Sequence, residues 1–116
     1  MMPRFIAGLV FLLLSLPASA HSPLLSSSPA DGASVTAAPE AFKMRFKGMA
    51  RLVRFTLAGE ISGDIELGKD HLMVEAQEHT IRLPVLGADG YEVRWRAMSA
   101  DGHVIKGRLS FTIQSP

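Results

Sequence analysis

Hydrophobic and polar residues alternate in several short segments of the chain. From Phe42 to Lys47, every second residue is apolar and the residues between are lysine or arginine. A period of two is typical of a strand with one buried face and one solvated face. The same alternation recurs at 53–57, 81–85, 91–97 and 109–113. The pattern therefore predicts a chain built from strands, each contributing one face to a core.

Turn-forming residues separate these segments, and no segment carries a sustained helical period. Glycine, aspartate and serine cluster at 31–32, 62–64, 68–70, 87–90 and 100–102. Short alternating strands with turns about every ten residues predict an all-β fold, an antiparallel sandwich or small barrel.

Prolines distinguish the segment that follows residue 20 from the central strands. Pro23 and Pro29 lie in the segment from His21 to Ala38, and Pro39 follows it directly. Proline has no N–H to donate to a ladder, so it is confined to sheet edges and connections. We expect an edge strand followed by an irregular connection in this segment.

The first residues do not follow the strand pattern. An apolar run, Phe5–Leu16, follows a basic start and precedes the small residues Ala18–Ala20, as in a secretory signal peptide. The alternative is a retained membrane anchor, but the run is shorter than the roughly 20 residues of a spanning helix. We expect cleavage after Ala20, so that 1–20 is a signal peptide and 21–116 is one mature domain.

Composition then excludes several classes of function. The chain has 12 Lys plus Arg and 11 Asp plus Glu, and loss of the single basic residue of the leader makes these counts equal. A nucleic-acid partner is not expected, because phosphate binding needs a basic surplus. The absence of cysteine excludes disulfides and thiolate metal sites. No second apolar run reaches membrane length, and no catalytic motif stands out, so we expect neither a membrane-embedded mature chain nor an enzyme.

The histidines are the main candidates for chemistry. His71 and His79 are expected to be ordinary solvated residues of a β-domain surface. His21 differs, because cleavage after Ala20 makes it the first residue. Its α-amine and ring Nδ1 then close on a metal as one chelate, and the amine, with an unperturbed pKa of about 7.7–8.0, loses its proton readily near neutral pH.

The partners expected for His21 lie in a second turn. Asp101 and His103 are two residues apart, so on extended backbone they project to the same side, and Gly102 permits a tight turn between strands. Pro23 has no amide hydrogen, which excludes a terminal site built on deprotonated backbone amides. Three nitrogens and one oxygen would suit tetragonal Cu(II). An Asp-Gly pair is also typical of an ordinary turn, and local sequence leaves that alternative open.

Several short motifs are spread along the whole mature sequence. They are SSPADG at 27–32, Ala38-Pro39, GYEVRWR at 90–96, SADGH at 99–103 and GRLSF at 107–111. Together they resemble the CopC family of small copper-binding proteins of the bacterial periplasm. The resemblance implies a Greek-key β-sandwich of the cupredoxin-like or immunoglobulin-like kind. It also implies a Cu(II) site in which His21, Asp101 and His103 are ligands.

Two departures from the family pattern limit this expectation. Pro23 stands where many members carry a second histidine, and Met44, Met49 and Met73 form no tight cluster. We therefore expect a single Cu(II) site and no separate Cu(I) site. The expected function is copper sequestration, transport or resistance in the periplasm by a monomer, and the resemblance implies a membrane copper transporter as partner.

Two other functions remain as alternatives. One is a copper-dependent oxidase with a terminal-histidine site, which would need an open coordination position and a broad binding face. A small domain whose single Trp95 and single Tyr91 lie on inward positions offers little of either. The other is a metal-free interaction module of the cell envelope, in which Asp101-Gly102 is a turn and nothing more.

Overall fold

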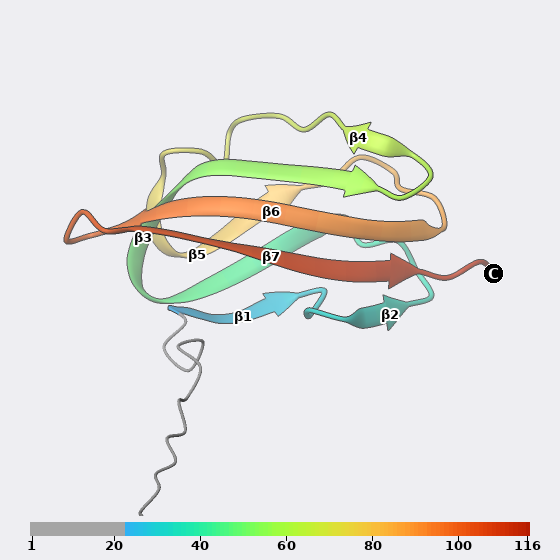
Figure 1. Cartoon of the computed structure of the whole chain (residues 1–116), viewed down its shortest axis with the longest axis horizontal. Helices are drawn as coiled ribbons and strands as arrows, with labels where there is room; N and C mark the ends of the chain where they lie inside the picture. The colour runs from blue at the N-terminus through green and yellow to red at the C-terminus, as the bar shows by residue number, and fades with distance from the viewer. Residues whose placement is uncertain (1–22) are drawn as a thin grey trace, which may run out of the picture.

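One curled sheet of seven strands makes up the part of the chain that the computed structural model describes, residues 23–116 (Figure 1). The strand order is β1-β3-β6-β7-β2, and β4 and β5 both pair with β3. The described residues contain no helix, and so no helix able to cross a membrane. The strands are β1 (Leu24–Ser28), β2 (Ala33–Val35), β3 (Ala41–Gly59), β4 (Gly63–Ile65), β5 (Glu75–Arg82), β6 (Asp89–Ser99) and β7 (Val104–Ile113).

The long strand β3 belongs to both halves of the curled sheet. Its first half pairs with β1 and β5, and its second half with β6 and β4. The pairing register shifts between Arg45 and Ala50 and again between Leu52 and Arg54. Such bulges bend a strand and increase its twist, and in Figure 1 β3 sweeps from one side of the sheet to the other. The two strands predicted at 41–47 and 53–57 are therefore one bent strand.

Inward side chains of the curled sheet form a single apolar core. Phe42 lies against Phe55 and Phe111, with ring centroids 5.5 and 6.1 Å apart. Trp95 meets Phe46 edge to face at 5.4 Å. Burying each such side chain contributes roughly 1.5–3 kcal/mol. The core holds these rings together with buried aliphatic residues, namely Met44, Leu52, Leu57, Ile81, Val93 and Ile113 among others.

The expected all-β sandwich is confirmed, with two local corrections. The pairing of β2 with β7 is parallel, whereas every other pair is antiparallel. A strand over 81–85 is wrong, since β5 ends at Arg82. Pro84 explains this end, because it cannot donate to a ladder and it restricts the residue before it. The edge position expected for the early segment is confirmed for β1 and β2.

His79 is not solvated as the sequence suggests; it is buried and only 3% exposed. Its Nε2 lies 3.0 Å from the carbonyl oxygen of Ala50 and 2.9 Å from that of Ala76. Carbonyls only accept, so Nε2 carries the hydrogen and donates to both. The ring also meets Phe46 edge-on, with centroids 5.6 Å apart. His79 thus fixes β5 to β3 where β3 bends.

The expectation for His71 is also wrong in part. Its ring is only partly exposed and lies edge-on to Phe55, with centroids 5.7 Å apart. Burial lowers the pKa of His71, and the charge of Asp70 opposes that effect. His71 is therefore a packing residue at the margin of the core.

Asp89, the first residue of β6, connects this strand to the turn between β3 and β4. This buried carboxylate accepts hydrogen bonds from the Ser62 hydroxyl at 2.7 Å, the Ser62 N–H at 2.8 Å and the Gly90 N–H at 2.8 Å, with a longer one from Ile61 N–H. These bonds, led by that from the Ser62 hydroxyl, lower the pKa of Asp89.

We expect Asp89→Asn to lower the melting temperature by several degrees at pH 7, since an amide cannot accept all of these bonds. Because the folded-state pKa is depressed, the stabilisation is fully present above the unfolded pKa, about 3.9, and is lost as the pH falls through the lower folded value. The difference from wild type should therefore shrink at pH 3. Asp64→Asn, at an exposed residue of β4, is the matched control, and equal losses in the two variants would contradict this role.

Replacing His79 should destabilise the fold more than replacing His71. His79→Ala leaves a cavity and two carbonyls without their donor, at a cost of about 2–4 kcal/mol in the free energy of unfolding. His71→Ala removes a partly exposed ring and should cost less. Urea unfolding of both variants measures the difference. An equal or smaller loss for His79→Ala would show that the bend does not need this side chain.

Candidate metal centre

The turn that joins β6 to β7 presents two of the three predicted site residues. The Ser99 N–H donates to the His103 carbonyl and the Gly102 N–H to the Ser99 carbonyl, both at 2.9 Å. Gly102 has a φ of +89°, a conformation that side chains disfavour. The Asp-Gly-His sequence therefore forms the turn expected from it, and it projects beyond the rest of the sheet (Figure 1).

Asp101 and His103 face each other across this turn. Oδ2 of Asp101 lies 2.8 Å from Nδ1 of His103, and its Oδ1 accepts a hydrogen bond from the Ser99 hydroxyl. Both side chains are open to solvent, 67% and 80% exposed. The expectation that they project to one side is confirmed.

Hydrogen bonding sets the protonation of this pair. The Ser99 hydroxyl first, and His103 second, hold the pKa of Asp101 at about 2, so the carboxylate is ionised at neutral pH. It accepts the hydrogen on Nδ1 of His103, which leaves Nε2 of the neutral ring with a free lone pair. A carboxylate that orients an imidazole in this way is common beside bound metals.

His21 lies outside the described residues, which begin two residues later, at Pro23. The Lys47 N–H donates to the Pro23 carbonyl at 2.8 Å, and Leu24 pairs with Phe46. Four residues farther along β3, Ala50 pairs with Ser99 at the base of the turn. The start of β1 and the turn thus lie at the same end of the sheet (Figure 1).

Other potential ligands are dispersed. His79 is engaged with backbone carbonyls, Met44 is buried in the core, and Met49 and Met73 are exposed. Within residues 23–116, no three histidine or carboxylate side chains gather closely enough to hold a metal ion. Asp101 and His103 therefore have no third histidine or carboxylate beside them among these residues.

Sequence reasoning missed Ser99. Its hydroxyl donates to the Asp101 carboxylate and also lies 3.2 Å from the His103 carbonyl oxygen. The spacing Ser-x-Asp-x-His was the available signal, because serine and aspartate side chains in turns commonly hydrogen-bond groups two residues away. Ser99 positions the two candidate ligands.

The chain matches a known family over nearly all of the described residues. The model of the CopC domain matches residues 24–114, which include every strand. Comparison with curated protein sequences gives no match.

Solved structures with the same fold carry related names. The crystal structure of CopC from Methylosinus trichosporium OB3b is 27% identical, with a TM-score of 0.64, and the match covers 82% of this chain and 95% of that one. PcoC, a methionine-rich copper resistance protein from Escherichia coli, is 29% identical, with a TM-score of 0.59 and coverage of 81% and 99%. Its selenomethionine form gives 28%, 0.58, 78% and 98%. With the family match, these likenesses confirm the resemblance drawn from the motifs: the chain belongs to the CopC family.

Proposed function

We propose that this protein is exported to the periplasm and binds one Cu(II) ion there, for copper sequestration, transport or resistance. The observation that carries the proposal is the Asp101–His103 pair, with an ionised carboxylate and a free imidazole nitrogen, at the end of the sheet where β1 begins. The structural relatives that are named as copper resistance proteins support it.

The proposed ligands are the α-amine and Nδ1 of His21 with Asp101 and His103, after cleavage leaves 21–116 as the mature domain. The free Nε2 lies on the far side of the His103 ring from Asp101, so both side chains can bind one ion only if the hydrogen bond between them breaks. Three nitrogens and one oxygen suit tetragonal Cu(II). These groups would act only by donating electron pairs to the ion. The Ser99 hydroxyl holds the Asp101 carboxylate in position through its hydrogen bond.

The proposed site requires the chain before Pro23 to reach the turn. Along β3, the step from Phe46 to Ala50 spans at most about 13 Å. From Pro23, two extended residues reach about 7 Å, and the side chains of His21 and His103 would have to span the remaining distance. Binding would order the start of the chain and stabilise the fold by mass action.

The exposure of the turn favours a carrier over an enzyme. Asp101 and His103 are largely open to solvent on a projecting hairpin, which suits exchange of an ion with another protein. Catalysis on a substrate needs positioned groups in a site that excludes water. We propose a monomeric carrier that gives copper to, or takes it from, a membrane copper transporter.

Blocking the terminal amine tests the chelate. A protein that begins with one extra glycine before His21 keeps every side chain but moves the amine away from the imidazole. We expect Cu(II) affinity at least tenfold lower than that of the protein beginning at His21, with a changed electron paramagnetic resonance spectrum, because one nitrogen donor is lost. Identical affinities and spectra would refute the terminal chelate.

Substitutions in the turn test the other ligands. We expect His103→Ala to weaken Cu(II) binding at least a hundredfold and Asp101→Asn by about 10–100-fold, while His71→Ala, the matched histidine control, leaves it unchanged. Wild-type affinity should fall as the pH drops below about 7, because the imidazoles and the amine take up protons. Asp101, with its pKa of about 2, remains ionised throughout that range. Titration calorimetry from pH 5 to 8 measures these effects, and wild-type affinity in the His103→Ala variant would overturn the site.

A further inference from the structure

The first half of β7 is an open sheet edge in the part of the chain that the structure describes. β2 pairs only with Phe111–Ile113, and Val104–Leu109 pair with β6 alone. The backbone of Ser110 points away from β6, since its N–H donates to Asp31 Oδ1 at 2.9 Å and its carbonyl accepts from Gly32 at 2.7 Å.

Lys106 and Arg108, which lie four and two residues before Ser110, direct their backbone groups to the same side as Ser110. On a regular strand, residues two and four apart direct their backbone groups to the same edge. The N–H and C=O groups of Lys106 and Arg108 therefore face the open edge, where no described backbone group pairs with them. Unpaired edge groups of this kind are a template for another strand.

A cleft accompanies this edge. It lies between β7 and β1, has a volume of about 600 Å³, and is lined by Leu25, Ser27, Lys106 and Gly107, with Trp95 in its wall. The open edge therefore has space beside it, and β1 does not cover it.

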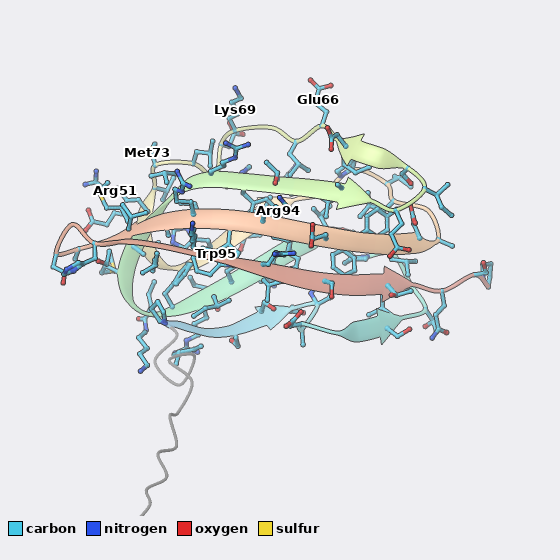
Figure 2. The ribbon with its side chains drawn as sticks, in the orientation of Figure 1. Arg51, Glu66, Lys69, Met73, Arg94 and Trp95 are labelled. Atoms are coloured by element: carbon cyan, nitrogen blue, oxygen red, sulfur yellow. The ribbon has the colours of Figure 1, made fainter. Side chains whose placement is uncertain are left out.

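Trp95 brings an unpaired donor to the same place. Trp95 is 5% exposed, and its buried Nε1–H has no hydrogen-bond partner in the described structure. A Cβ built at Gly107 would lie 2.9 Å from Nε1, so the missing side chain there lets the indole edge lie against β7. Figure 2 shows Trp95 along β6 beside β7. A buried N–H without an acceptor is destabilising.

The positive charges beside this edge indicate the charge of the partner that would bind there. Arg54, Arg96 and Lys106 stand directly opposite one another across β3, β6 and β7, with no ion pair to any described carboxylate. Like charges at opposed positions destabilise a sheet. In the next row, Arg94 and Arg108 share the single carboxylate of Glu92, at 3.1 and 3.4 Å. An acidic partner would neutralise this surplus, whereas the lysine and arginine of the edge would repel the same edge of a second copy.

We propose that the edge of β7 from Val104 to Arg108 docks an extended acidic segment of another protein, which adds to the sheet as a further strand. Backbone hydrogen bonds to Lys106 and Arg108 supply affinity, as in other cases of strand addition. The side chains of these two residues are about 6.7 Å apart along the strand, the spacing of alternate residues on the incoming segment. Carboxylates at every second position of that segment would thus meet both cations.

A peptide titration tests this on the copper-free protein that begins at His21. The probe is a blocked peptide of four Glu-Val repeats. Fluorescence of the single tryptophan follows binding, and NMR follows amide exchange and the indole N–H. We expect saturable binding, a shifted indole signal, and slowed exchange at Lys106 and Arg108. Four Lys-Val repeats, and a Glu-Val peptide of equal charge interrupted by proline, should bind at least tenfold more weakly.

Two substitutions separate strand addition from charge attraction. Lys106→Pro removes the charge and the edge N–H and leaves the ladder with β6 intact, because that N–H does not bond β6 and proline is tolerated on edges. Lys106→Ala removes the charge alone. We expect the proline variant to bind at least tenfold more weakly than the alanine variant, with folding checked by circular dichroism. A third variant, Lys106→Glu, keeps the backbone but reverses one charge among the arginines of this face, and should reduce the preference for Glu-Val over Lys-Val repeats at least tenfold.

Several outcomes would overturn the proposal. They are equal binding of the proline-interrupted peptide, equal affinity of the Lys106→Pro and Lys106→Ala variants, and an unchanged preference in Lys106→Glu. Binding to vesicles of anionic phospholipid without binding of the Glu-Val peptide would overturn it in favour of a membrane surface. Because copper is absent, failure here leaves the proposed copper function untouched.

Discussion

The bend of β3 is the constraint on which the rest of the molecule depends. One strand serves both halves of the sheet only if its pairing shifts register between Arg45 and Ala50, which leaves backbone groups without ladder partners. His79 supplies a hydrogen-bond donor at this bend, because its Nε2–H donates to the carbonyls of Ala50 and Ala76. Ala50 in turn pairs with Ser99, so the ring that fixes the bend also fixes the base of the Asp101–His103 turn.

The local parts of the structure were predictable from sequence, and the non-local parts were not. Alternation identified the faces of 91–97 and 109–113, and Asp-Gly-His identified a turn, because each depends on neighbours in the chain. The union of 41–47 with 53–57 depends on bulges paired with other strands. His79 also resisted prediction, since its two acceptors are backbone carbonyls that composition does not reveal.

The candidate site likewise contains residues that local sequence predicts and residues that it does not. Asp101 and His103 were predictable as a pair, because only Gly102 separates them and an Asp-Gly pair is typical of a tight turn. Ser99 was missed although it lies only two residues before Asp101, because a serine at a strand end ordinarily signals nothing beyond solvation. Its hydroxyl matters through the carboxylate that it contacts. The contribution of His21 depends on chain processing and on residues that the structure does not describe, and it remains a prediction.

The two proposals concern adjacent parts of the β6–β7 hairpin and use different chemistry. The copper site would use side chains of the turn that ends at His103, and the docking edge would use the backbone that begins at Val104. An ion held by side chains as exposed as these can exchange with any incoming ligand. Selective delivery must then come from contacts outside the ligand set. A strand added to β7 would place one end of a partner's segment beside His103, so an edge that recognises an acidic partner would decide which protein meets the ion.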